Sequence, residues 1–470
     1  MSTDESSDTV LLPGGEGTEG ARRTRRLRIG IVSAIASRGI AAVAPLMLIP
    51  LTFGYLETHV YGLWMAVVSL TSMALWADLG LGNGLMTRLS HAIAVEDRRL
   101  GRQLVSTAYF LLSVFALTCL LFLLVIVQWI PWDAALNIVD SDASPLAPRI
   151  ALICLGAFIL NIPFSLIQRI QYSHQEVAQS NAWVAAGSVA SVALAWTAVR
   201  ADLGVTLVIL GVALAPILGN LLNTAWFFHR HRDSVPRPRD VGGVAARSMV
   251  GLGGRFLAIT LVSSVALNVD TLLIAHTSGL DEAAVYSVAA RVMTALGLLV
   301  TLINLPLWPA NVEALAKGDS TWVVRTTRRM SLLSAASVAV PGLMLAWLCA
   351  PLFSWWLGPS TPLPSQELVI SLSLWWVLPA AISPVMMVLN AVGATKAQLI
   401  GWSAFLLASI PLKLAMGTAW GPVGVVAAGI LTYFATVWPA ALLGYRAQLR
   451  VLATNSKSEL IPPRQIPEPL

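Results

Sequence analysis

Charged residues are scarce in this chain of 470 residues. Asp, Glu, Lys and Arg together make up 11% of it, whereas 56% of the residues are hydrophobic. A soluble globular domain carries about 25% charged residues, so the composition excludes one. The apolar runs are long enough for spanning helices and too long for barrel strands. The sequence therefore predicts an all-α integral membrane protein.

Other chemistry-bearing features are missing too. The three cysteines, Cys119, Cys154 and Cys349, lie in apolar runs, so no disulfide framework is expected. The six histidines show no metal-ligand spacing. No nucleotide-binding loop occurs, so we expect neither direct use of ATP nor a resident cofactor, with H⁺ or Na⁺ as candidate coupling ions. The net charge of +6 does not indicate nucleic acid, because basic residues in a membrane protein report orientation first.

Twelve apolar runs are predicted to span the membrane. They cover residues 29–53, 60–85, 104–130, 150–171, 181–199, 204–228, 251–276, 283–309, 330–350, 367–391, 399–418 and 422–445. Of the 30 Lys and Arg residues, 24 lie on the side of the two termini, two lie on the opposite side and four lie inside spans. The positive-inside rule then predicts that both termini are cytoplasmic.

The spans divide into two sets of six at a basic segment. We expect a disordered cytoplasmic N-terminal tail at 1–27, a first lobe at 28–228, a basic cytoplasmic linker at 229–250, a second lobe at 251–446 and a cytoplasmic C-terminal tail at 447–470. The outer loops are short, which leaves no room for a folded extracellular domain.

Local sequence matches indicate that the two lobes are repeats. The pattern E-x-x-x-Y at 57–61 returns at 282–286, and AIAVED at 92–97 corresponds to ALAKGD at 314–319. Because both lobes begin on the cytoplasmic side, the repeat is parallel. Its pseudo-twofold axis would run along the membrane normal, with the substrate between the lobes.

Basic residues inside spans are the candidate substrate-binding groups. A buried guanidinium must face a cavity or a partner, and it matches phosphate oxygens bidentately. The predicted binding residues are Arg38, Arg255, Arg291, Arg169 at the end of the fourth span, and Lys413. The alternative interpretation is internal salt bridges, or snorkelling to the interface.

Two intraspan carboxylates need their own explanation. Asp78 ends an apolar run and is followed by Gly80, Gly82 and Gly84, and Asp270 lies in the outer half of the seventh span. An intramembrane carboxylate is costly and is retained for a reason. We expect each to serve in coupling or gating, either by binding H⁺ or Na⁺ or by forming a capping or gate ion pair.

Proline and tryptophan give weaker signals. Pro411 lies two residues before Lys413 and predicts a kink in that helix. Nine tryptophans, Trp64 and Trp375 among them, gather mostly at predicted span ends, which is typical of the interfacial aromatic belt. The alternative for Trp375 and Trp376 is stacking against a sugar.

Short motifs in three spans resemble one transporter family. They read YGLW at 61–64, DLGLGNG at 78–84, NVDTLLI at 268–274, VYSVA at 285–289 and PLWP at 306–309. Over roughly residues 28–446 the chain resembles the polysaccharide-transport (O-antigen flippase-like) branch of the multidrug/oligosaccharidyl-lipid/polysaccharide (MOP) exporter superfamily.

This resemblance implies a fold and an activity. The fold is about twelve transmembrane helices in two six-helix lobes around a central cavity. The activity is movement of polyprenyl-pyrophosphate-linked oligosaccharides from the inner to the outer leaflet of the bacterial cytoplasmic membrane, for lipopolysaccharide or other surface polysaccharides. Expected partners are the lipid-linked oligosaccharide, membrane lipids, and a polysaccharide polymerase or glycosyltransferases.

Other functions make different predictions. An organic cation antiporter of the same superfamily predicts an acidic cavity, yet the intraspan bases outnumber the acids four to two. A membrane glycosyltransferase or ligase needs a sizeable outer loop with acidic or His residues, which the sequence lacks, so no enzyme is expected. A scaffold without transport leaves the intraspan arginines unexplained.

Substitution of Arg38 tests the binding role. We expect Arg38→Ala to abolish transport while expression stays intact, because the cavity loses a phosphate-binding charge. Transport of the lipid-linked glycan in cells is the measurement, and normal transport would contradict the assignment.

Overall fold

The computed structural model describes residues 36–37, 39–40, 43–73, 81–138, 144–304, 307, 311, 314–315, 319–358, 361–392 and 394–458. Within these ranges, side chains are described except at 83, 87, 94, 248–260, 298–299, 301–303, 395 and 451–458. Every regular element in this part of the chain is helical. The predicted N-terminal tail, Arg38 and Asp78 lie outside the described residues.

The first half of the chain supplies the helices up to the basic linker. Residues Val43–Phe53 are helical and are followed by α2 (Thr58–Met73), α3 (Leu81–Ala94), α4 (Arg98–Ile126), the short α5 (Trp132–Leu136), α6 (Ala147–Ser173), α7 (Val177–Arg200) and α8 (Val205–Arg230). Three 3₁₀ turns, η1 (Ser144–Leu146), η2 (Arg232–Ser234) and η3 (Pro238–Asp240), complete this half.

The described elements of the second half are also helices. Its helices are α9 (Gly243–Asn268), α10 (Asp270–Ser278), α11 (Leu280–Asn304), α13 (Ser320–Trp347), α14 (Cys349–Leu357), α15 (Gln366–Ala391), α16 (Thr395–Ala435) and α17 (Val437–Ser458). Eight helical stretches of the described residues are long and apolar enough to cross a bilayer. The protein is therefore a multi-pass, all-helical membrane protein.

Two matching turns open the helices α4 and α13. Asp97 accepts a hydrogen bond from the Leu100 amide at 2.9 Å, and Asp319 accepts one from the Trp322 amide at the same distance. The amides of Asp97 and Asp319 donate to the carbonyls of Ala92 and Ala314, respectively, each at 2.9 Å. An N-cap Asp satisfies a free amide of the first turn. The repeated sequence thus forms the same capped turn twice, as a structural repeat predicts.

The structure separates the last two predicted spans where the sequence separates them. Helix α16 passes through Pro411 with helical dihedral angles. The chain leaves the helical conformation at Trp420 and at Gly421, between the predicted spans 399–418 and 422–445, and the φ of Gly421 is +60°. That left-handed conformation favours glycine. The span predicted at 422–445 is interrupted again at Thr436, and α17 continues to Ser458.

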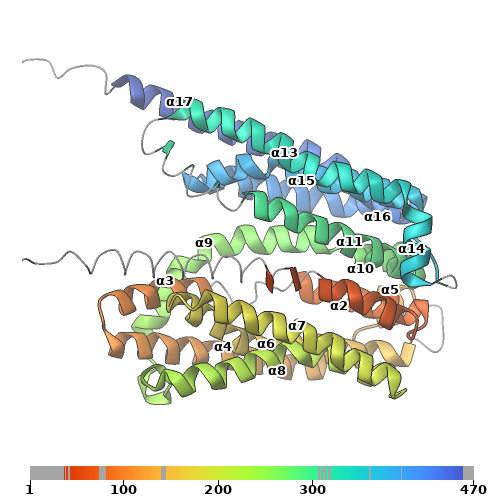
Figure 1. The fold of residues 1–470 in the computed structure, drawn as a ribbon, viewed down its shortest axis with the longest axis horizontal. Coiled ribbons are helices and arrows are strands. Elements are labelled where there is room, and N and C mark those ends of the chain that lie inside the picture. Colours follow the sequence, from red (N-terminus) through yellow and green to blue (C-terminus); the bar gives the residue numbers. More distant parts are fainter. Residues whose placement is uncertain are drawn as a thin grey trace, which may run out of the picture.

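The two halves lie on opposite sides of α9 and α10 (Figure 1). Helices α2 to α8 form one group, and α11 to α17 form the other. Helix α9 contacts α2 and α3 of the first group and α16 of the second, and α11 packs along α2. The interface between the halves is therefore built mainly from α2, α9, α10 and α11.

The halves are in backbone contact on the side predicted to face outward. A Cβ atom built on Gly62 of α2 would lie 1.8 Å from the carbonyl oxygen of Leu280, the first residue of α11. Nearby, the His276 Nδ1 of α10 lies 3.1 Å from the Ala135 carbonyl of α5. Only glycine permits this backbone contact. Gly62 therefore allows the two halves to meet on this side.

A methyl group at Gly62 should separate the halves here. In Gly62→Ala, α2 and α11 must move apart by about 1 Å or more to relieve the overlap. Double electron–electron resonance measures the distance between spin labels at Glu57 and Asp281 in a protein whose native cysteines have been replaced. We expect longer distances than in the parent protein. Gly54→Ala, whose Cβ would meet its nearest neighbour at 3.5 Å, is the control. An unchanged distance distribution would contradict the closure.

Candidate functional site

A cavity of about 480 Å³ lies between the two halves. The helix Val43–Phe53 and α2 line it from the first half, and α9, α10, α11 and α15 line it from the second. Hydroxyl groups of Ser69, Ser72, Ser287 and Thr294 lie in its wall. Its charged lining residues within the described part of the chain are Asp270 and Arg291. We call it the central cavity.

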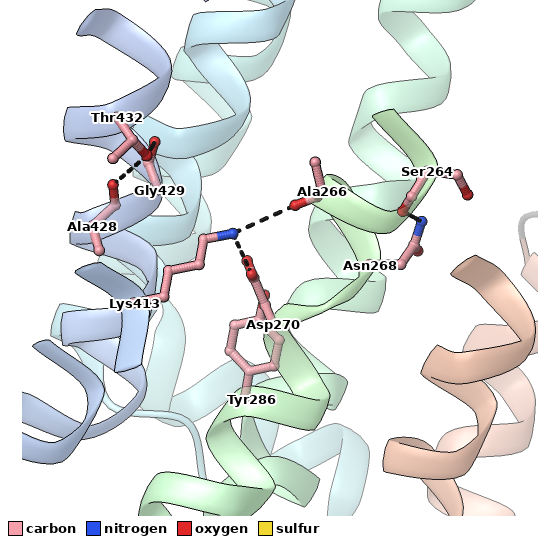
Figure 2. A network of polar contacts seen from close by, with 9 residues as sticks. All are labelled: Ser264, Ala266, Asn268, Asp270, Tyr286, Lys413, Ala428, Gly429 and Thr432. Carbon is pink, nitrogen blue, oxygen red and sulfur yellow. Dashed lines mark hydrogen bonds and ion pairs between the residues drawn. The ribbon is translucent and has the colours of Figure 1, made fainter. Parts of the chain in front are cut away.

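Asp270 is neutralised by a lysine from another helix. The Lys413 Nζ of α16 lies 2.5 Å from Asp270 Oδ1 at the start of α10 (Figure 2). Lys413 is 0% exposed and Asp270 is 5% exposed. The Tyr286 hydroxyl of α11 donates to the other carboxylate oxygen of Asp270 at 3.4 Å. Three helices of the second half therefore meet at one buried carboxylate.

A break between α9 and α10 contributes a further partner. The helices are separated at Val269, and Asp270 opens the new helix. One turn earlier, the Ala266 carbonyl accepts a hydrogen bond from Lys413 Nζ at 3.5 Å (Figure 2). The Phe405 ring also faces the ammonium group, with its centroid 5.3 Å from Nζ. Lys413 thus ends in a closed polar site, although the sequence predicted that it binds substrate.

Arg291 is placed differently. It projects from α11 toward the first half, where its Nη2 donates to the Met65 Sδ of α2 at 3.0 Å. No carboxylate of the described residues lies within 4.0 Å of its guanidinium group. A thioether is a weak acceptor for a group with five N–H donors. Arg291 therefore keeps most of its binding capacity for a ligand in the cavity.

The remaining predicted residues are spread along the chain. Arg255 belongs to α9, but its side chain lies outside the described residues, as do Arg38 and Asp78 altogether. Arg169 lies in the last turns of α6 and is not among the residues that line the central cavity. The structure thus brings Asp270 and Arg291 to one cavity and places Lys413 directly behind Asp270.

Several tryptophans belong to the interior and not to an interfacial belt. Trp64 and Trp375 are buried, which corrects the belt prediction for these two. Trp375 stacks on Phe405 and meets Tyr433 edge to face. Its neighbour Trp376 is half-buried and lines the central cavity. In the sequence, these positions are marked by two consecutive tryptophans in the middle of a predicted span.

The sequence did not reveal a second cavity inside the first half. It has a volume of about 220 Å³ and lies between the helix Val43–Phe53, α2, α6 and α8. It shares four lining residues with the central cavity, Pro45, Met65, Val68 and Arg291. Its amide-bearing side chain is Asn161 of α6. We call it the side cavity.

A polar cluster outside both cavities lies where α6 and α8 end. The His231 Nε2 is 3.3 Å from a carboxylate oxygen of Glu176, and the His174 and His231 rings are 5.3 Å apart. Burial lowers the pKa of His174, which follows α6. In the described part of the chain, no three His, Cys, Asp or Glu side chains are grouped so that they could hold a metal ion. The cluster therefore gives no metal site.

Comparison with known proteins places the chain in a family. The sequence profile of the polysaccharide biosynthesis protein family matches residues 27–315. The chain belongs to this family. None of the curated proteins matches it significantly.

Solved structures show the same fold at low identity. An inward-facing multidrug resistance MATE transporter of the MOP superfamily is 18% identical, with a TM-score of 0.68 over 88% of this chain and 99% of the other. The lipid II flippase MurJ in its inward closed conformation is 13% identical, with a TM-score of 0.66 over 92% and 93%. A MOP transporter from Pyrococcus furiosus, described as having a binding pocket of reverse polarity, is 16% identical, with a TM-score of 0.61 over 91% and 96%. This family member therefore has the transporter fold of the MOP superfamily.

Removing one partner of the buried ion pair should destabilise the protein. Lys413→Met leaves the carboxylate of Asp270 buried and unpaired, which costs about 3–5 kcal/mol. The double variant Lys413→Met with Asp270→Leu should recover most of this loss, because no charge is left behind. Unfolding in detergent, followed by circular dichroism, measures both. Lys396→Met, at an exposed lysine of the same helix, is the control. An unfolding midpoint of Lys413→Met equal to that of the parent would contradict the pairing.

Proposed function

We propose that the protein is a flippase for a polyprenyl-pyrophosphate-linked oligosaccharide. It would move this lipid from the inner to the outer leaflet for surface polysaccharide synthesis, and it is not an enzyme. The charge balance of the central cavity carries this proposal. Asp270 is paired with Lys413, so the charge that remains available at the described cavity wall is the cation of Arg291.

An unpaired guanidinium selects for an anion. Arg offers a planar fork of donors that fits phosphate oxygens, and it keeps its charge when it is desolvated. A pyrophosphate is the anionic group that every substrate of this class shares. We infer that Arg291 binds it, with Arg38 and Arg255 as further candidate contacts and Arg169 as an entry residue. An organic cation would instead require a free carboxylate.

Sugar units need other chemistry, which the cavity also contains. The ring of Trp376 offers an apolar surface of the kind that packs against sugars. Ser69, Ser72, Ser287 and Thr294 donate their hydroxyl protons to backbone carbonyls of their own helices, so their lone pairs can accept hydrogen bonds from a glycan. The volume of about 480 Å³ falls in the range of small-molecule sites. We therefore infer that the pyrophosphate and the nearest sugars occupy it while the polyprenyl chain stays in the lipid.

The conformation suits an inward-facing state of a transport cycle. Contacts between Gly62 and Leu280 close the side predicted to face outward. The two lobes, proposed at 28–228 and 251–446, would rock about these contacts so that the cavity faces each leaflet in turn. Under this proposal both termini are cytoplasmic.

The buried ion pair is the candidate coupling element. Proton binding to Asp270 would remove the charge that holds Lys413 and loosen the junction of α10, α11 and α16. A change confined to one lobe can in this way alter how that lobe packs on the other. We propose this coupling or gating role for Asp270, and for Asp78 as an untested second candidate.

Lipid analysis of a strain without the gene tests the function. We expect that one complete polyprenyl-pyrophosphate oligosaccharide accumulates in extracts analysed by mass spectrometry, and that the matching surface polymer is lost. An unchanged lipid pool together with sensitivity to cationic compounds would contradict the flippase and favour a cation antiporter.

Complementation of that strain tests Arg291. Loss of a charge-assisted contact costs about 1.5–3 kcal/mol, so Arg291→Gln should lower export about ten-fold or more. Arg291→Lys should retain more activity because the charge remains. The control is Arg149→Gln, an exposed arginine in the first turn of α6. Wild-type export by Arg291→Gln would contradict the assignment.

A further inference from the structure

We propose that the side cavity binds the acetamido group of an N-acetylated sugar directly attached to the phosphate of the substrate. This inference rests on the proposed function and adds the class of sugar that is recognised. It depends on three observations, which are the position of Arg291 between the two cavities, an unused amide donor on Asn161, and the small apolar space around it.

Arg291 lies where the two cavities adjoin. It lines both of them, together with Pro45, Met65 and Val68. A phosphate bound by Arg291 therefore lies at the mouth of the side cavity. Groups on the sugar atoms next to the phosphate are the parts of the substrate that can enter this cavity.

Asn161 provides the polar end of the side cavity. Its Oδ1 accepts a hydrogen bond from Asn220 Nδ2 at 2.9 Å, and the Oδ1 of Asn220 accepts one from Gln168 at 3.1 Å. The first bond fixes the orientation of the Asn161 amide. Its Nδ2 has no acceptor among the described residues, although the side chain lines the cavity. A donor held in this way fits a carbonyl oxygen.

A second polar atom fits the other half of an amide. The Thr71 hydroxyl also lines the side cavity, and it donates its proton to the Val68 carbonyl at 2.7 Å. Its lone pairs are therefore left to accept. Asn161 as donor and Thr71 as acceptor thus offer the two kinds of partner that the C=O and N–H of an acetamido group require.

The rest of the wall is suited to a methyl group. Leu48, Ile49, Cys154 and Ala157 surround the space, and Trp64 and Phe158 add aromatic faces. The volume of about 220 Å³ is below the roughly 300–1,000 Å³ of sites for drug-sized ligands. The cavity thus holds one substituent rather than a chain of sugars. A hydroxyl in place of the acetamido group would leave the Asn161 donor without its acceptor and the apolar wall unfilled.

Binding of sugar phosphates to the purified full-length protein tests the proposal. The probes are N-acetylglucosamine 1-phosphate and glucose 1-phosphate, which differ in the acetamido group alone, measured by calorimetry in detergent. We expect the first to bind roughly ten-fold tighter or more, as one hydrogen bond and a buried methyl group predict. In Asn161→Leu the two affinities should become equal. In Arg291→Gln both should weaken.

Two further variants separate recognition from helix packing. Asn223 pairs with Gln171 across the same α6–α8 interface at 2.7 and 2.9 Å, but it does not line the side cavity. Asn223→Leu should therefore keep the preference for the N-acetylated probe. Ala157→Leu fills the cavity without removing the amide and should abolish that preference.

Several results would overturn the proposal. Equal binding of the two probes by the parent protein is one, and an unchanged preference in Asn161→Leu is another. Loss of the preference in Asn223→Leu would show that the amides serve packing alone. The lipid analysis of the deletion strain is independent of these measurements. If the lipid-linked glycan accumulates but the probes bind equally, the sugar assignment fails and the flippase proposal stands.

Discussion

A charge inside a membrane protein needs a partner or a cavity, and this constraint determines which charge is available in the central cavity between the two halves. Lys413 and Asp270 satisfy each other at 2.5 Å, with Tyr286 and the Ala266 carbonyl as additional partners. Their pairing ties α16 to the start of α10. It also removes the one described carboxylate of the central cavity as a partner for Arg291. The cavity is thereby left with an available cation, which is the basis of the proposed preference for an anionic substrate.

Closure on one side depends on close backbone contact. Gly62 lets α2 touch the first residue of α11, and α11 carries Arg291 three turns further on. Movement at this contact would therefore shift the guanidinium relative to Met65 and to both cavities. In this arrangement the residue proposed to bind the anion belongs to the helix that contacts α2 where the halves meet. The proposal therefore couples binding and conformational change through one rigid element.

Much of the architecture follows from the sequence, because hydrophobic length and charge are local properties. The helix-rich membrane class and the correspondence between residues 92–97 and 314–319 could be predicted. The contacts between side chains in the site could not be predicted to the same degree. Lys413 and Asp270 are 143 residues apart, and nothing local shows that one neutralises the other. The side cavity depends on how α2, α6 and α8 pack, which is a tertiary property.

Two details show where sequence patterns succeed and fail. The break between the last two predicted spans lies at Trp420 and Gly421, where glycine permits a positive φ. The sequence groups Trp64 and Trp375 with the interfacial tryptophans, but both are buried in the core. There Trp64 meets Tyr61 edge to face, and Trp375 stacks on Phe405.

Reconstitution tests the central claim most directly. The purified protein would be placed in liposomes that carry a polyprenyl-pyrophosphate oligosaccharide, and an impermeant glycosidase would report how much glycan reaches the outer leaflet. The account predicts that the whole pool becomes accessible over time with the parent protein, and that only the initially exposed part becomes accessible with Arg291→Gln. Equal accessibility in protein-free liposomes and in liposomes with the parent protein would contradict it.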